Sequence, residues 1–576
     1  MRATCTEKGL TVNLIAGTHV VLIAMNLTKA RATGLLGFSI ERTDHTEGEK
    51  YFLKNFLLFK VNDTGAKADH SSDNNPFQEF LWGDYTAKPE HTYTYRVIAK
   101  KGRPGRLQPD NEVSVTVTTE SEVTDDHAIF FNRGVAASQA YADKFHNQRP
   151  EKVPNNAAYI WLSRGLEEAL LKFIGQASGP GFGLRACMYE FSYPEVLQAF
   201  GIASRAGADV RIVYDYNAKT VKDKSTGQSR TERDPGDRDL KAITTAGITA
   251  LCTPRQQSDN ISHNKFIVLL EGNRPVQVWT GSTNITEGGI FGHSNCGQIV
   301  RDPAIARVYL DYWKRISGDP GPKAFKAYVE SLTPVPDKKG QKPPKQTMLP
   351  VLSPRPSIRA LKWYAELMDG AKSGVFATFP FGVNADFLKV LAKRRAFLRY
   401  ALLDKPSLGR GPNQVEIISR DPNNRATAGT TLKGGLAQWA AEKLTGLNVN
   451  VPYIHTKYMI IDPLGDDPIV INGSANFSEN SILHNDENSL VARGDMRMAD
   501  VFLGEFMRLF NHYYFRAAVT EPRKPNDTAD STHQAAANDP AGKVYLKETD
   551  GWAMRFFEAS NPRARERKYF GGTIAI

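Results

Sequence analysis

The chain lacks the features that mark several common protein classes. It has four cysteines in 576 residues, and no CxxC pair or Cys/His cluster has the spacing of a zinc site. A disulfide scaffold and a structural zinc module are therefore excluded. No apolar run is long enough to cross a membrane, and the most apolar segment, residues 9–27, contains Asn13, His19 and Asn26 and no clear signal-peptide cleavage site. We interpret this segment as buried β-strands and expect the protein to be cytoplasmic or exported without a classical signal peptide.

The composition is that of an ordinary globular chain. Hydrophobic residues make up 41%, charged residues 23% and aromatic residues 10%, which excludes wholesale disorder, collagen and coiled coil. The length allows about four domains. Lys and Arg number 73 against 62 Asp and Glu, for a net charge of +11. This excess is suited to a polyanionic partner, such as nucleic acid, an anionic membrane surface or a phosphate-bearing substrate.

Residues 1–122 predict an all-β module. Short alternating runs, for example residues 35–42, 93–99 and 112–118, are separated by turns rich in Gly, Pro and Asp. Residues 80–102, FLWGDYTAKPEHTYTYRVIAKKG, resemble the later strands of a fibronectin type III sandwich. We expect this module to bind an unknown partner and not to catalyse a reaction.

The rest of the chain predicts two α/β halves, which we place at residues 123–333 and 358–520. A Pro- and Lys-rich stretch, residues 334–357, predicts a linker between them. Residues 521–576 predict a flexible connection and a docking segment that contains Trp552, Phe556 and Phe557. Helices are expected at 158–175 and 358–371, and strands at 209–215, 266–270, 276–280, 397–404, 458–462 and 469–472.

A repeated motif lies in the two halves. Residues 262–284 read SHNKFIVLLEGNRPVQVWTGSTN, and residues 454–476 read IHTKYMIIDPLGDDPIVINGSAN. In each string the Gly of GSxN lies 18 positions after the His of HxK, and the copies are offset by 192 residues. The strands that end in Asp215 and Asp404 are 189 residues apart, so the duplication extends upstream of the motifs.

Each motif predicts a cluster of side chains at one edge of a sheet. Residues i and i+2 share a face of a strand, and the next strand returns the Ser and Asn of GSxN to the same edge. If the halves pack about a pseudo-twofold axis, the two clusters meet in one pocket. The candidate catalytic residues are His263, Lys265, Ser282 and Asn284 in the first half, and His455, Lys457, Ser474 and Asn476 in the second.

Such a pocket contains the groups that phosphodiester cleavage requires. One neutral imidazole can attack phosphorus and form a phosphohistidine, while the other, protonated, gives its proton to the leaving alcohol. The lysines and asparagines can hold the non-bridging oxygens of the phosphate. We therefore expect no cofactor and no metal.

The doubled HxK and GSxN pattern resembles the phospholipase D superfamily with its HKD motifs, over roughly residues 125–520. The resemblance implies two α/β halves that form one catalytic unit, complete in a single chain. In the second copy Asp462 occupies the place of the motif's acid, where the resemblance implies a structural role. In the first copy Leu270 stands there, with Glu271 beside it. We expect this difference to weaken the local architecture without abolishing activity.

The family also places a carboxylate or amide after GSxN, bonded to the His of its own half. This implies Glu487 for His455 and Gln298 for His263. A carboxylate favours imidazolium and a neutral amide does not, so His455 is expected to be the initial acid and His263 the nucleophile. The other ten histidines are treated as structural.

Three functions remain open at this stage. The first is a phospholipase D that releases phosphatidic acid and also transfers the phosphatidyl group to alcohols; the second is a metal-independent nuclease. The third is a catalytically dead scaffold, which would require the first motif to be inactive. Basic runs at residues 219–238 and 410–425 lie at matching places in the halves, and they are either solvated loops or the rim of the cleft. We favour the lipid enzyme, because the superfamily's nucleases more often resemble short chains with one motif.

Overall fold

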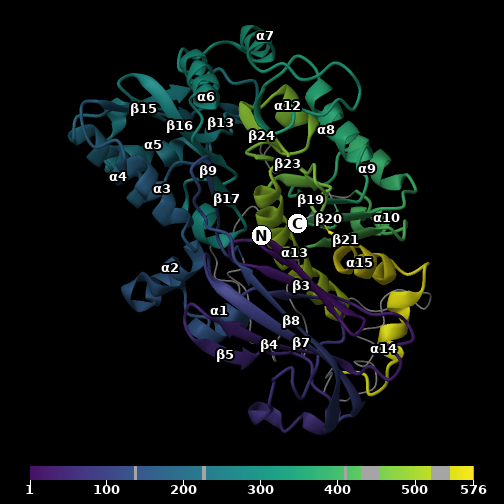
Figure 1. Ribbon diagram of the computed structural model, residues 1–576. Coiled ribbons are helices and arrows are strands. Elements are labelled where there is room, and N and C mark those ends of the chain that lie inside the picture. Colours follow the sequence, from purple (N-terminus) through teal and green to yellow (C-terminus); the bar gives the residue numbers. More distant parts are fainter. Residues whose placement is uncertain (135–138, 223–228, 408–410, 430–452, 521–544, 575–576) are drawn as a thin grey trace.

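The computed structural model describes residues 1–134, 139–222, 229–407, 411–429, 453–520 and 545–574. These residues form an N-terminal β-sandwich and two α/β units, each built on a seven-stranded sheet (Figure 1). The mixed α/β class expected from the sequence is therefore confirmed.

The sandwich has two four-stranded antiparallel sheets that share one apolar core. Residues 9–27 form its strands β2 and β3, which are buried almost throughout, as predicted. The likeness to a fibronectin type III domain stays a prediction. In sheet order the strands are β1 (Arg2–Glu7), β2 (Leu10–Ala16), β3 (Val21–Asn26) and β6 (Leu81–Asp84), then β5 (Glu49–Phe52), β4 (Gly37–Asp44), β7 (Thr92–Arg103) and β8 (Arg106–Thr118).

The two seven-stranded sheets have the same strand order. The first runs β14 (Cys252–Arg255), β11 (Asp209–Asp215), β10 (Phe182–Met188), β15 (Lys265–Glu271), β16 (Arg274–Gly281), β17 (Cys296–Val300) and β9 (His127–Phe131). The second, in the matching direction, runs β21 (Asn424–Ala428), β20 (Leu398–Leu403), β19 (Gly374–Phe379), β22 (Tyr458–Ile461), β23 (Ile469–Gly473), β24 (Glu487–Arg493) and β18 (Thr347–Ser353). The first three strands of each list are parallel and the others pair antiparallel. The motif strands β15 and β22 thus occupy equivalent positions.

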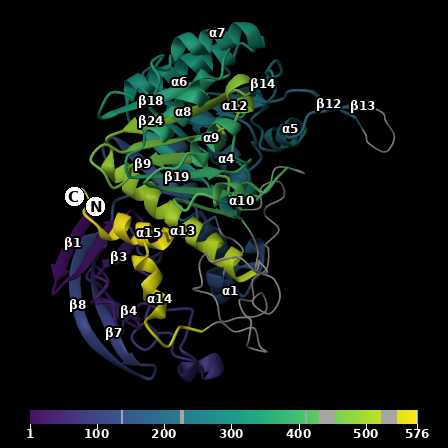
Figure 2. The same ribbon diagram turned by 90° about the vertical axis from the view of Figure 1, so that its right-hand side faces the viewer.

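Helices pack on both sheets, and α13 (Met496–Thr520) runs through the middle of the molecule, between the sandwich and the α/β units (Figures 1 and 2). Its buried residues share one core with the sandwich and the second sheet. Among the described residues, no helix combines the length and apolar character that crossing a membrane requires.

The hairpin of β12 (Lys219–Lys222) and β13 (Ser229–Glu232) projects from the body (Figure 2). The other helices are α1 (Gln139–Phe145), α2 (Ala157–Ser163), α3 (Leu166–Gly175), α4 (Pro194–Arg205), α5 (Gly236–Thr245), α6 (Pro303–Ile316), α7 (Pro322–Leu332), α8 (Arg359–Asp369), α9 (Ala385–Ala392), α10 (Gln414–Ile418), α12 (Glu479–Leu483), α14 (Gly551–Met554) and α15 (Pro562–Gly571).

Two sequence predictions about elements are wrong. The helix expected at residues 158–175 is divided into α2 and α3, because Arg164 and Gly165 both adopt left-handed backbone angles. The stretch 334–357 is not all linker, since β18 pairs with β24 in the second sheet. Its Pro350 is tolerated because β18 is an edge strand.

Residues 545–574 contact both the sandwich and the second α/β unit. Trp552 and Phe556 are buried in the sandwich core, and the indole Nε1 of Trp552 donates to the carbonyl of Leu35 over 2.9 Å. In α15, Glu566 accepts from Tyr400 of the second sheet over 2.6 Å. The segment thus ties the sandwich to the second α/β unit. The connection expected within residues 521–544 lies outside the described residues.

Candidate active site

The two HxK segments cross from one α/β unit to the other. The backbone N–H of His263 donates to the carbonyl of Asp486 over 2.9 Å, and that of His455 donates to the carbonyl of Ser294 over 3.2 Å. Each segment is also held from within its own unit. Asp215 accepts from the N–H of Ser262 over 2.6 Å, and Asp404 does so from the N–H of Ile454 over 2.9 Å. Asp215, at the end of β11, and Asp404, directly after β20, therefore hold the two HxK segments in the same way.

The glycine of each GSxN motif is required by close backbone approach. Gly281 and Gly473 have φ values of 151° and 155°, which disfavour a side chain. A Cβ on Gly281 would collide with the carbonyl oxygen of Cys296, and one on Gly473 with that of Asn488. The strand ends can therefore pass close enough to deliver the serines and asparagines that follow.

The two candidate histidines are each paired with the opposite half. Nδ1 of His263 lies 3.1 Å from Oε2 of Glu487, and Nδ1 of His455 lies 2.9 Å from Oδ1 of Asn295. The expectation that each His bonds a group of its own half is therefore wrong. Gln298 does not hold His263; it is buried within β17, and its Nε2 contacts the sulfur of Met348 at 3.9 Å.

The structure thus adds Asn295 to the candidate site. The spacing of the repeat would have found it, since Asn295 lies 14 residues after Gly281 and Glu487 lies 14 after Gly473. Sequence reasoning aligned chemical types, amide with carboxylate, and so chose Gln298. Strand register decides instead: Gln298 lies three residues after Asn295, and an odd shift along a strand turns a side chain to the other face.

Neighbouring side chains hold both partner groups, Asn295 and Glu487, in place by hydrogen bonds. Ser282 donates to Oδ1 of Asn295 over 2.8 Å, whereas Oε1 of Glu487 accepts from Ser481 and Asn485 over 2.9 and 2.7 Å. In the second half the motif serine, Ser474, accepts from the N–H of Asn488 over 3.0 Å. The two motif serines are therefore buried supports.

In each unit a polar residue at the end of an edge strand, β9 or β18, holds the loop that leads to Asn295 or to Glu487. After β9, Nδ2 of Asn132 donates to the carbonyls of Ile290 and His293 over 2.8 and 2.9 Å, and its Oδ1 accepts from the N–H of Asn295 over 2.9 Å. At the end of β18, Ser353 donates to the carbonyls of Ser481 and Asn485 over 2.8 and 3.0 Å. Neither residue stood out in the sequence.

The motif lysines lie beneath the histidines. Nζ of Lys265 donates to the carbonyl of His263 over 2.6 Å, and Nζ of Lys457 donates to that of His455 over 2.5 Å. Burial lowers the pKa of Lys265 to about 7, and burial together with the Lys265 ammonium holds the pKa of Lys457 well below its usual value. A bound anion would reverse both shifts, because it would compensate the crowded positive charge.

Burial also depresses the basicity of the histidines. It lowers the pKa of His263 to about 4, with the Lys265 ammonium acting in the same direction and Glu487 opposing both. The pKa of His455 lies well below its usual value, because of burial and the nearby Lys457. A third imidazole, His293, stacks on His455 with ring centroids 4.5 Å apart, and burial lowers its pKa to about 3. Sequence reasoning treated His293 as structural, and its position two residues before Asn295 was the missed signal.

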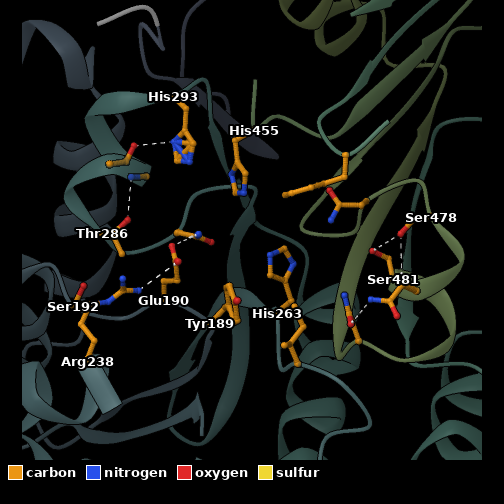
Figure 3. A pocket seen from close by; sticks show the side chains of 18 of the residues that line it. Tyr189, Glu190, Ser192, Arg238, His263, Thr286, His293, His455, Ser478 and Ser481 are labelled. Atoms are coloured by element: carbon orange, nitrogen blue, oxygen red, sulfur yellow. Dashed lines mark hydrogen bonds and ion pairs between the residues drawn. The ribbon is translucent and has the colours of Figure 1, made fainter. Parts of the chain in front are cut away.

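A cavity of about 660 Å³ opens between the two units at this point (Figure 3). His263 and His455 lie in its middle, with Glu190, Thr286 and His293 on one side and Ser478 and Ser481 on the other. The asparagines of both motifs also line it. Neither motif lysine does, which differs from the predicted pocket. The lining residues are Tyr189, Glu190, Ser192, Arg238, Ile261, His263, Asn284, Thr286, Glu287, Gly288, Gly289, His293, Phe381, His455, Asn476, Ser478, Asn480, Ser481 and Asn485.

The two halves differ at the position of the motif's acid, which is Asp462 in the second half and Leu270 in the first. Asp462 accepts from the N–H groups of Lys372, Ser373 and Gly374 over 2.7–3.1 Å, and so fixes the start of β19. In the first half Leu270 packs in an apolar core, and Glu271 ends β15. His263 nevertheless lies within ion-pair distance of Glu487, at 3.1 Å.

The basic runs are divided between two environments. Arg238, at the end of the first run, lines the cavity. Arg425, at the end of the second, is buried and pairs with Glu566 at 2.6 Å. Residues 223–228 and 408–410 of these runs lie outside the described residues.

One group of metal-ligand types was found in the described part of the chain, and it lies in the sandwich. It consists of Asp44, Glu47 and His91. Glu47 is paired with Lys88 at 2.5 Å, and Asp44 accepts from His91 and from backbone N–H groups. These pairings explain the cluster without an ion.

Comparison with known proteins supports a phospholipase D-like fold. Residues 170–317 and 408–511 match the family model described as "Cardiolipin synthase, PLD-like domain". A search of the curated proteins found no match.

Parts of this chain are similar to solved structures of several bacterial proteins. Phosphatidylserine synthase of Haemophilus influenzae Rd KW20 shares 11% identity, covering 61% of this chain and 85% of its own, with a TM-score of 0.39. Nuc of Salmonella typhimurium, a phospholipase D family member, shares 25% identity over 27% of this chain and 87% of its own, with a TM-score of 0.20. Polyphosphate kinase of Porphyromonas gingivalis shares 13% identity over 56% of this chain, with a TM-score of 0.35, and the match spans 42% of the kinase. The family match covers two segments with one HxK motif in each, so this part of the chain is similar to a phospholipase D-like domain in two parts.

Proposed function

We propose that the protein is a phospholipase D-type phosphodiesterase that cleaves phospholipids to phosphatidic acid through a covalent phosphohistidine. The observation that carries the proposal is the pair of buried imidazoles, one from each half, in a single cavity. Nδ1 of each ring is engaged by Glu487 or Asn295, which leaves Nε2 of each ring for the substrate. The equal strand orders and reciprocal contacts support a pseudo-twofold unit that is complete in one chain.

The partner of each His, which lies in the opposite half, indicates which His is the nucleophile and which is the acid. The nucleophile gains positive charge when its ring is phosphorylated, whereas the acid loses positive charge as its proton leaves. Catalysis favours groups that stabilise the charge as it develops. The Glu487 carboxylate therefore suits His263 as the nucleophile, and the neutral Asn295 suits His455 as a strong acid.

Two steps then complete the reaction. Nε2 of His263 attacks phosphorus, the bond from phosphorus to the alcohol oxygen breaks, and His455 gives its proton to that oxygen. His455 next takes a proton from water, the hydroxide attacks phosphorus, and the bond to His263 breaks to release phosphatidic acid. An alcohol in place of water yields a transferred phosphatidyl group. Lys265 and Lys457 supply positive charge beneath the reacting phosphate.

The cavity wall favours a lipid over a nucleic acid. The described lining residues include Arg238 and two carboxylates, Glu190 and Glu287, whereas a polyanion needs a basic channel. Phe381 lies on the wall with 47% of its surface exposed, an apolar contact suited to a lipid. The reciprocal support of His263 and His455 also argues against a dead scaffold.

The test is release of phosphatidic acid from vesicles of mixed anionic and choline-headed lipids, with EDTA present. We expect release by the wild type and by His45→Asn, a control on the sandwich, and none by His263→Asn or His455→Asn. Acid quenching should trap phosphate on His263 alone. Near wild-type turnover by either cavity variant would refute the two-half site. Absence of release by the wild type would refute the lipid assignment, and plasmid and single-stranded DNA would then be assayed.

A further inference from the structure

The cavity wall on the first-half side contains a carboxylate where a bound phosphate needs positive charge. Oε2 of Glu190 accepts a hydrogen bond from Nδ2 of Asn284, and its Oε1 lies 3.4 Å from NH2 of Arg238. All three residues line the cavity (Figure 3). Because a carboxylate repels the phosphate group itself, this arrangement is suited to another part of the substrate.

Glu190 also decides which end of the Asn284 amide faces the cavity. A carboxylate only accepts hydrogen bonds, so it must face the NH2 group. Oδ1 of Asn284 is then left without a partner, although the residue is only 5% exposed. A buried acceptor without a donor costs free energy until a ligand supplies one. Glu190 and Asn284 therefore present acceptors to the cavity, which is the opposite of what a phosphate oxygen requires.

This wall lies on the side of the proposed acid. His293 lies on the same side of the cavity as Glu190, and its ring stacks on that of His455 (Figure 3). In an in-line displacement the leaving alcohol lies next to the acid and opposite the nucleophile. The leaving group therefore lies against the wall that contains Glu190 and Asn284.

We propose that Glu190, Asn284 and Arg238 form a subsite for the leaving alcohol that selects head groups bearing hydrogen-bond donors. The proposal rests on the phospholipid activity proposed above. The hydroxyls of a glycerol head group, or the ammonium of ethanolamine, donate to Oδ1 of Asn284 and to Glu190. Esterified choline has no N–H or O–H to donate. A site that accepts hydrogen bonds from its substrate discriminates strongly against an analogue that has no donor. An apolar pocket discriminates less strongly between substrates that differ only in size.

Head-group selectivity tests this subsite. Phosphatidylglycerol, phosphatidylethanolamine and phosphatidylcholine with the same acyl chains are presented in neutral detergent micelles, and kcat/KM is measured for each. We expect both donor-bearing lipids to exceed the choline lipid by about tenfold or more. Glu190→Gln should bring the three within about threefold, because an amide both donates and accepts and no longer fixes Asn284.

Glu287→Gln is the matched control. It makes the same charge change on the same wall, but Glu287 accepts from Tyr159 and not from Asn284, so the selectivity should remain. Each variant is compared with itself across head groups, so a loss of folded protein leaves the ratios unchanged. Equal use of all three lipids by the wild type, selectivity kept in Glu190→Gln, or a preference for ethanolamine alone would each overturn the subsite.

A soluble diester separates failure of the subsite from failure of the proposed function. Turnover of bis(p-nitrophenyl) phosphate reports the histidine chemistry without a head group. Turnover of this diester without any lipid cleavage would refute the lipid assignment, and the subsite with it. Lipid cleavage that ignores the head group would refute the subsite and leave the proposed function in place.

Discussion

Replacement of Glu487 by Gln removes the charge beside His263 and keeps the shape of the side chain. Glu487 is fully buried, and its Oε2 lies 3.1 Å from Nδ1 of His263. With charge centres ~4 Å apart and an effective dielectric constant of ~20, the carboxylate favours positive charge on His263 by ~4 kcal/mol. If the transition state uses that stabilisation in full, formation of the phosphohistidine slows by ~10³-fold.

The proton position adds to this loss. Oε1 of Glu487 accepts from Ser481 and Asn485, so a Gln that keeps these bonds turns its NH2 toward His263. Nδ1 must then accept, the ring proton moves to Nε2, and attack on phosphorus is blocked. We therefore regard ~10³-fold as the smaller end of the expected effect.

Rapid-quench measurement of the phosphoenzyme, with bis(p-nitrophenyl) phosphate as the substrate, provides the assay. Titration of the histidine ring signals by NMR should show that Glu487→Gln lowers the pKa of His263 further and leaves His455 unchanged. Asn295→Asp is the reciprocal variant and should raise the pKa of His455. A loss of less than tenfold, or a shift of His455 in place of His263, would refute the crossed pairing.

Three further predictions follow from neighbouring residues. Lys265→Ala and Lys457→Ala should each lower kcat by ~10²–10³, as for other donors that stabilise developing charge; unchanged single-turnover rates would exclude them from the chemistry. Asn132→Ala removes three hydrogen bonds to the loop that holds His455, so kcat should fall by ~10² with KM nearly constant, and an equal effect on both would indicate a binding defect. Burial lowers the pKa of His293 in the folded protein to about 3, from the ordinary value of 6.5. Between these two pH values the imidazole is protonated in the unfolded chain and neutral in the folded protein, so the free energy of unfolding falls as the pH drops from 6.5 toward 3. Denaturant unfolding should show a pH slope shallower by ~1.4 kcal/mol per pH unit in His293→Gln, and an unchanged slope would refute this contribution.

The sequence alone determined the parts of the site that depend on local pattern. Equal spacing in the two motifs placed HxK and GSxN at equivalent strand ends, because the period of a strand and the glycine at each close approach are local properties. The same reasoning found the buried strands at residues 9–27 and the docking of Trp552 and Phe556.

Only the tertiary structure decided which groups meet. Asn295 serves His455 and Glu487 serves His263 because the loops cross between the units, and chain order does not reveal such a crossing. The sequence predicts a linker where β18 lies, because the partner that stabilises this strand is β24, about 140 residues away. The orientation of Asn284 depends on Glu190, 94 residues away. Contacts between distant segments fix the charge around each imidazole, and that charge sets what each imidazole can do.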